Sequence, residues 1–173
     1  LEAAIKKASS KDEKDLEIIT YEGYAAHGIA VLVETVTDNP TRTVANVRSY
    51  FNKYGGSLGT SGSVSFMFDH KCNFRVKRKM DVDVDMLELE LIDVGCEELS
   101  VENDELIIYG AFDAFGKLHH YFEENQYEIV ESGFDRIPTM TKKLTPEQEI
   151  DVKKLLDKME DDDDVQDVYS TME

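Results

Sequence analysis

The chain has few of the features that define whole classes of protein. Its 173 residues include only two cysteines, Cys72 and Cys96, which cannot form a disulfide framework, so we expect two free thiols in an intracellular protein. No apolar run approaches the roughly 18 residues that a membrane crossing requires. A secretory signal is also missing. The sequence therefore predicts a cytoplasmic protein without a membrane partner.

The patterns of a catalytic or metal centre are missing too. No nucleophile stands at a recognisable spacing from a base, and no pair of carboxylates can be singled out among 37 acidic residues. His119, His120 and Glu124 share one-turn spacing, but no further ligand accompanies them, so a surface helix is favoured over a metal site. The aspartates at 161–164 lack the glycine of a calcium loop and predict a solvated helix end. We expect no enzymatic activity, no metal and no cofactor.

Positive charge is scarce and unevenly placed. Lysine and arginine number 19 against 37 acids, and the net charge of −18 repels nucleic acid over most of the surface. Residues 81–105 contain eleven acids and no lysine or arginine. A basic segment, 75–79, stands just before them. This break in charge predicts a domain boundary near residue 80.

The best-defined element is a helix over residues 40–54. Asn39 is a good N-cap, and Pro40 occupies the first helical position, where proline is favoured. Apolar residues at spacings of three and four give the helix one buried stripe, and Gly55 supplies its C-terminal stop. The glycine-rich segment 55–62 follows this helix, whereas a phosphate-binding loop precedes one. A structural turn is therefore favoured over a nucleotide site.

Periodicity and capping predict the other elements. Segment 82–94 alternates like a strand, but its Leu, Met and Glu favour a helix, and we choose helix. Thr145 to Gln148 has the capping box of a further helix. The remaining prediction is a helix over 112–122 and strands over 16–24, 29–36, 63–68 with an extension through Phe74 and Val76, 99–102, 106–109, 127–131, 140–144 and 165–169. This order predicts an α+β fold of small sheets with helices on one face.

The chain opens with L-E-A-A-I-K-K-A, the pattern of a helix interior without an N-cap. We therefore expect residues 1–15 to be the end of a preceding helical domain and a linker. The acid-rich residues 80–137 are expected to form a domain inserted into another that is built from residues 16–79 and 138–173.

Four segments resemble the YebC/PmpR family, which includes the translational activator of mitochondrial cytochrome c oxidase subunit I. They are residues 21–24 (Y-E-G-Y), 37–44 (T-D-N-P-T-R-T-V), 55–64 (G-G-S-L-G-T-S-G-S-V) and 163–169 (D-D-V-Q-D-V-Y). The resemblance implies two ferredoxin-like α+β domains, one inserted into the other, behind a basic helical N-terminal domain. It also supports the helix over 82–94.

The resemblance implies a non-enzymatic regulator of gene expression, of the kind described as a transcriptional regulatory protein that binds DNA. The alternatives are a ribosome-associated translation factor and an acidic protein-interaction module that binds a basic partner. We expect a monomer whose main basic surface lies in the missing N-terminal domain. No recognition-helix, zinc or ribonucleoprotein motif is present.

Few places on this chain can meet a DNA or ribosomal RNA phosphate. The candidate contacts are the cations of the capped helix and of the basic segment: Arg42, Arg48, Lys53, Arg75, Lys77, Arg78 and Lys79. A solvated helix face explains the first three equally well. The last four stand within five residues and repel one another without an anion nearby, which favours a partner contact. Phe66 and Phe68 alternate as in a strand that stacks on RNA bases, but burial in a core is favoured for both.

Overall fold

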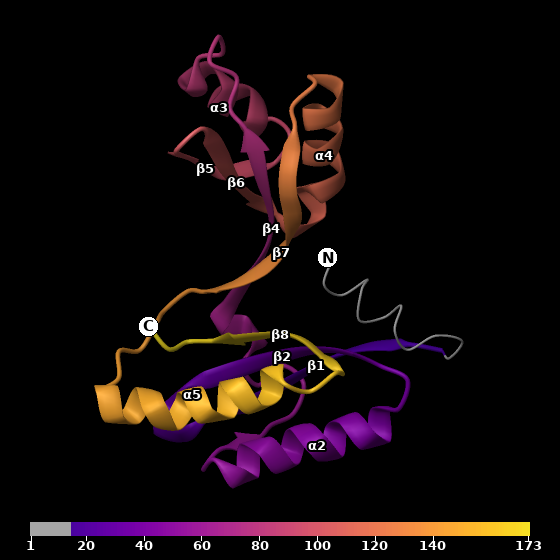
Figure 1. Cartoon of the computed structure of the whole chain (residues 1–173), viewed down its shortest axis with the longest axis vertical. Helices are drawn as coiled ribbons and strands as arrows, with labels where there is room; N and C mark the ends of the chain where they lie inside the picture. Colours follow the sequence, from indigo (N-terminus) through magenta and orange to yellow (C-terminus); the bar gives the residue numbers. More distant parts are fainter. Residues whose placement is uncertain (1–14) are drawn as a thin grey trace. The chain divides into compact units, whose positions relative to one another are not determined.

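The computed structural model describes residues 15–173 (Figure 1). They form two compact units: the insert unit, His70–Ile137, and the host unit, which combines residues 15–69 and 138–173. The predicted helix end and most of the predicted linker lie outside the described residues. Within residues 15–173, no helix combines the length and apolar composition that a membrane crossing needs.

The host unit is built on a four-stranded sheet with strand order β3-β1-β2-β8. Strands β1 (Glu17–Tyr24) and β2 (Ala30–Thr37) form the predicted antiparallel hairpin. Strand β3 (Ser57–Leu58) pairs with β1, and β8 (Val165–Ser170) pairs with the other edge of β2. Because β2 is central and covered on both faces, seven of its eight residues are buried, and its first four, A-V-L-V, are all apolar.

Two helices cover one face of the host sheet. Helices α2 (Pro40–Lys53) and α5 (Pro146–Glu160) pack Phe51 and Leu155 against Val33 of β2, and Figure 1 shows both on the same side of the sheet. Both helices begin where capping predicts, since the Asn39 side chain accepts a hydrogen bond from the Arg42 N–H and Thr145 forms a capping box with Gln148.

The opposite face of the host sheet is covered by an irregular segment. Leu32 packs there against Val64 and Phe68. The predicted strand over 63–68 is wrong, because residues Ser65–Met67 form a short 3₁₀ turn (η2) that precedes the next strand. The predicted strand over 140–144 is also wrong, because the pairing there is a single bridge between Lys142 and Met172.

The insert unit follows the order β-α-β-β-α-β, the ferredoxin-like arrangement. Its sheet has the strand order β5-β6-β4-β7. The elements are β4 (Phe68–Lys77), α3 (Val84–Ile92), β5 (Cys96–Glu102), β6 (Glu105–Ala111), α4 (Phe115–Glu124) and β7 (Ile129–Pro138), with a 3₁₀ turn η3 (Phe112–Ala114) before α4. The helix chosen for 82–94 and the α+β class are confirmed.

Charge places the boundary at residue 80, but strand pairing places it ten residues earlier. Strand β4 pairs with β6, with Lys71 opposite Ala111 and Lys77 opposite Glu105, so residues 70–77 belong to the insert unit's sheet. The break in charge therefore marks the end of a strand, and the insert unit ends at Ile137.

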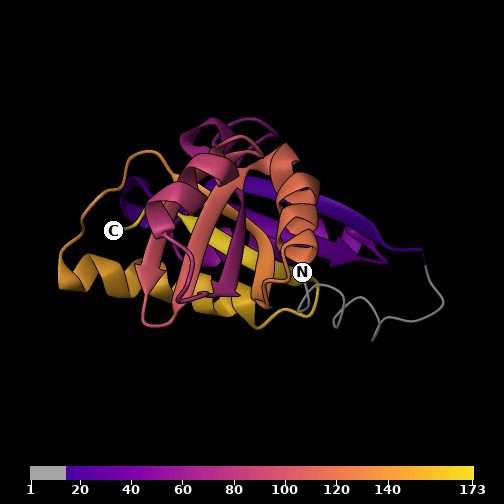
Figure 2. The same cartoon turned by 90° about the horizontal axis from the view of Figure 1, so that it is seen from above.

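Helices α3 and α4 cover one face of the insert sheet (Figure 2). Phe74 of β4 and Ile108 of β6 are buried beneath Leu91 of α3 and Phe122 of α4. The cysteines of this unit are buried free thiols within the same core. Side chains of alternate residues on β4 and β6 point to the other face, which we call the open sheet face.

Candidate nucleic-acid interface

The seven predicted contact residues are divided between the two units. Three lie on α2 of the host unit (Arg42, Arg48 and Lys53), and four lie at the end of β4 and in the loop after it (Arg75, Lys77, Arg78 and Lys79). Neither unit therefore contains the complete set.

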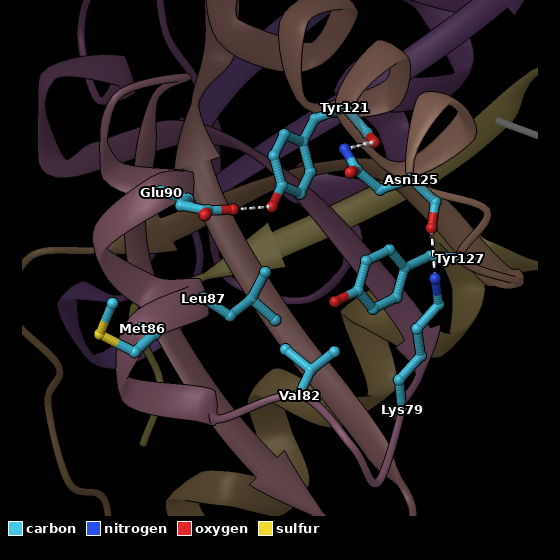
Figure 3. Close-up of a pocket in the computed structure, with 8 residues that line it drawn as sticks. All are labelled: Lys79, Val82, Met86, Leu87, Glu90, Tyr121, Asn125 and Tyr127. Atoms are coloured by element: carbon cyan, nitrogen blue, oxygen red, sulfur yellow. Dashed lines mark hydrogen bonds between the residues drawn. The ribbon is translucent and has the colours of Figure 1, made fainter.

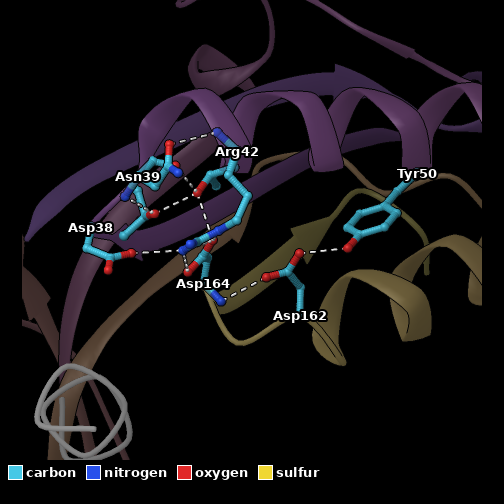
Figure 4. A network of polar contacts seen from close by, with 8 residues as sticks. Asp38, Asn39, Arg42, Tyr50, Asp162 and Asp164 are labelled. Carbon is cyan, nitrogen blue, oxygen red and sulfur yellow. Dashed lines mark hydrogen bonds and ion pairs between the residues drawn. The ribbon is translucent and has the colours of Figure 1, made fainter. Parts of the chain in front are cut away.

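Arg42 connects α2 to the segment before β8 (Figure 4). Its Nη2 donates to Oδ1 of Asp164 at 3.0 Å and to Oδ1 of Asp38 at 2.9 Å. The Thr43 hydroxyl also donates to Asp164, at 2.8 Å, and the Asp164 side chain is only 4% exposed. The hydrogen bonds that Arg42 donates to Asp38 and Asp164 raise the pKa of Arg42 above its usual value. The Arg42 guanidinium is thus part of the host unit's own structure.

The aspartates of 161–164 do not all behave as a solvated helix end. The Tyr50 hydroxyl of α2 donates to Asp162 at 2.7 Å, and the other oxygen of Asp162 accepts the Asp164 backbone N–H at 2.8 Å (Figure 4). Burial is the main cause that raises the pKa of Tyr50, and the hydrogen bond to Asp162 raises it further. The prediction fits the exposed Asp161 and Asp163, but it is wrong for Asp162 and Asp164.

Arg48 and Lys53 are exposed on α2. Lys53 places its Nζ 5.5 Å from the centre of the Tyr54 ring. Within residues 15–173, no ion pair engages either cation. Both stay open to a polyanionic partner, as they would on any solvated helix face.

The glycine-rich loop after α2 does hold an anion, and that anion belongs to the chain. Glu22 is 5% exposed, and its carboxylate accepts hydrogen bonds from the backbone N–H groups of Gly62 (2.7 Å), Val64 (2.9 Å) and Ser65 (2.6 Å). Burial alone would raise the pKa of Glu22, but these bonds outweigh it and hold the pKa below its usual value. This contact supports the structural turn.

Arg75 and Lys77 lie on the open sheet face. Their Nε and Nζ atoms stand 3.7 Å and 3.8 Å from the two carboxylate oxygens of Glu105, which is opposite Lys77 in the sheet. The expectation that these cations have no anion nearby is wrong, because strand pairing brings Glu105 of β6 next to them. Such an exposed pair still leaves both cations accessible to solvent.

Arg78 and Lys79 do not continue this surface. The Lys79 ammonium lies 4.4 Å above the Tyr127 ring and donates to the Asn125 carbonyl oxygen. Arg78 is half-buried, and its Nε is enclosed without a hydrogen-bond partner in the described part of the chain. The basic segment therefore divides into two exposed cations and two that contact their own unit.

Tyr109 is an aromatic residue on the open sheet face that the sequence patterns do not single out. Tyr109 on β6 lies opposite Asn73 on β4, which is two residues from Arg75. Burial is the main cause that raises the pKa of Tyr109, and the negative charges of Asp135 and Glu98 raise it further. Alternation along β6 could have grouped Tyr109 with Ile107, but only the fold shows which face the helices leave open.

The structure also places the other aromatic residues and the histidines that the sequence singles out. Phe68 is buried, as expected, whereas Phe66 is 71% exposed, so the expectation of a core position is wrong for Phe66. Nδ1 of His119 lies 2.6 Å from the Glu123 carboxylate, and Nε2 of His120 lies 3.4 Å from the Glu124 carboxylate, each one turn along α4. In residues 15–173, no group of three or more His, Cys, Asp or Glu side chains is placed to hold a metal.

These features define a two-unit α+β protein in which distinctive sequence segments make contacts within the fold. Residues 16–172 match the family described as the TACO1/YebC second and third domain. The chain belongs to the TACO1/YebC family.

Similar proteins cover nearly all of the chain. A "Probable transcriptional regulatory protein" of Porphyromonas gingivalis is 54% identical over 172 residues, which cover 99% of this chain and 71% of the relative. One from Flavobacterium johnsoniae is 55% identical, with 99% and 72% covered. The crystal structure of the conserved hypothetical protein Aq1575 from Aquifex aeolicus is similar with a TM-score of 0.74 and 34% identity, over 94% of this chain and 67% of that one.

Proposed function

We propose that the protein is a non-enzymatic, cytoplasmic and monomeric regulator of gene expression that contacts nucleic acid. The observation that carries the proposal is the family match, which spans both units and includes relatives named as transcriptional regulatory proteins. The relatives are longer than this chain, which covers 71% to 72% of their length. We propose that a basic region outside these 173 residues makes the main contact.

The open sheet face is the proposed contact of this chain. Arg75 and Lys77 offer cations to phosphate oxygens, and Tyr109 offers a ring on which an unpaired base can stack. Glu105 competes with phosphate for both cations, so the contact is weak and sensitive to salt. Arg48 and Lys53 are exposed on the other unit and add a second, separate phosphate contact.

Charge reversal tests the open sheet face. The substitution Lys77→Glu is made in a protein that also contains the proposed basic region. It is expected to weaken binding of a fluorescent DNA duplex and to reduce the slope of log affinity against log salt by about 0.9. The control is Lys117→Glu, which replaces another exposed cation; Lys117 lies on α4, which covers the opposite side of the sheet. An unchanged slope for Lys77→Glu would remove this face from the proposal.

A ribosome-associated role in translation is the second candidate. It is favoured by Tyr109 on an open sheet in a ferredoxin-like unit, an arrangement suited to single-stranded RNA. Sedimentation with ribosomes, and competition between duplex DNA and a single-stranded ribosomal RNA fragment, distinguish the candidates. Ribosome association that survives nuclease treatment would instead favour a protein partner.

A further inference from the structure

Helix α3 has two apolar faces. Leu87 and Leu91 are buried against the insert sheet. On the opposite side, Met86, Leu89 and Ile92 are 60%, 62% and 53% exposed. A helix that covers a sheet normally places charged side chains on its outer face, so three large apolar residues there need another explanation.

Carboxylates border this outer face. Asp85 and Asp93 stand four residues before and after Leu89, so both lie on its side of the helix, and both are exposed. No lysine or arginine occurs anywhere in residues 81–105, which carry eleven acids. The outer face of α3 is therefore an apolar strip inside an anionic field.

The strip continues into a pocket of about 250 Å³ (Figure 3). Its lining residues are Lys79, Val82, Met86, Leu87, Glu90, Tyr121, Asn125 and Tyr127. Met86 belongs to both the strip and the pocket. The Tyr121 hydroxyl donates to Glu90 at 2.5 Å, and the Lys79 ammonium covers the Tyr127 ring. Val82, Met86 and Leu87 line the same pocket, so an apolar side chain that enters it has apolar neighbours.

We propose that the outer face of α3 and this pocket bind a cationic amphipathic helix of a partner protein. Its apolar side chains would cover Met86, Leu89 and Ile92, with one entering the pocket, and its lysines or arginines would reach Asp85 and Asp93. The negative charge around the strip favours a cationic partner. A nucleic acid or an anionic membrane is repelled by these carboxylates, and a second copy would place them against their own counterparts. The proposal goes beyond nucleic-acid contact and uses none of the residues of the open sheet face.

The test uses a synthetic helical peptide with leucine on one face and lysine on the other. We expect amide NMR signals of the 173-residue chain to shift at α3 and around the pocket. Leu89→Gln is expected to weaken binding about tenfold. Asp85→Asn combined with Asp93→Asn should also weaken binding and flatten its dependence on salt. All three positions are exposed, so urea unfolding should verify that the variants stay folded.

The matched control is Val101→Gln, which should leave binding unchanged. Val101 is an exposed apolar residue on β5 of the same unit. Equal binding of a peptide with the same leucines and lysines in scrambled order would overturn the proposal, since it would show charge attraction alone. Shifts confined to other elements, or full affinity of Leu89→Gln, would also overturn it. A dimer in sedimentation that Leu89→Gln abolishes would assign the face to a second copy. Duplex DNA binding is measured on the same variants, so each of the two proposals can fail without the other.

Discussion

The Arg42 guanidinium and the Asp164 carboxylate form an ion pair across 122 residues of sequence, with Nη2 and Oδ1 3.0 Å apart. Arg42 lies in the segment T-D-N-P-T-R-T-V and Asp164 in D-D-V-Q-D-V-Y, two of the segments that carry the family resemblance. The insert unit interrupts the chain between them. These two segments therefore share a structural task, which is to join the two parts of the host unit.

Replacing Asp164 tests this connection. Asp164→Asn keeps the shape of the side chain but removes the charge that pairs with Arg42, and we expect a loss of about 2 kcal/mol in the free energy of unfolding. Arg42 is partly exposed, so water limits the loss. Urea unfolding at neutral pH measures the change. The adjacent, exposed Asp163→Asn is the control and should change stability by less than about 0.5 kcal/mol. Equal midpoints for the two variants would contradict the assignment.

Glu22 gives the host unit a pH-dependent contribution to stability. Its pKa is lowered in the folded protein, so the contribution is present above the unfolded pKa of about 4.3 and is lost as pH falls through the lower folded value. We expect Glu22→Gln to cost roughly 1–3 kcal/mol at pH 7 and much less at acid pH. Urea unfolding across pH measures the difference between the variant and the wild type. Glu17→Gln, exposed on the same strand, is the control and should change stability at pH 7 by less than about 0.5 kcal/mol.

Two glycine substitutions should have opposite effects. A Cβ atom on Gly23 would stand 2.6 Å from the Ser57 carbonyl oxygen and 2.8 Å from the Phe51 ring, so Gly23→Ala should destabilise the host unit by about 2 kcal/mol. A Cβ atom on Gly116 in α4 would meet no atom within 4 Å, so Gly116→Ala should stabilise the insert unit by about 0.5–1 kcal/mol. Thermal unfolding measures both, and a stabilising Gly23→Ala would contradict the close approach of β3.

The two thiols should react slowly in the folded protein. Burial raises the pKa of Cys72, and it raises that of Cys96 to about 11. The thiolate is the reactive form, so little of either cysteine is reactive at pH 8. We expect a chromogenic disulfide reagent to modify both cysteines rapidly in urea and slowly without it. Rapid modification under native conditions would show that the insert unit opens locally.

The elements that the sequence predicts correctly are those with local signals. Asn39 and Thr145 cap their helices through bonds that span three residues, and those bonds are present in the structure. The alternation of Val64, Phe66 and Phe68 was misleading, because a short helical turn breaks it and exposes Phe66. Periodicity describes a regular backbone and cannot report where the chain bends.

The contacts of the candidate site depend on pairings between distant residues. Strand register brings Glu105 to Lys77, and packing of α2 brings Asp164 to Arg42. A sequence with 37 acids offers every cation many partners, so composition alone cannot select the right one. The exposed cations could be proposed from sequence, whereas their division between surface and internal roles required the fold.

The pairing of β4 with β7 closes the insert unit at its two ends. The first and last strands of the insert unit are neighbours in its sheet, and the Thr139 N–H donates to the Met67 carbonyl at 2.9 Å where the host chain resumes. The insert thus leaves and rejoins the host at one point, as a surface loop does. Loop closure depends only weakly on length, and a folded insert holds its own ends together. The host unit therefore meets the insert only as a closed loop, and the distance between the ends of that loop is set by the pairing of β4 and β7.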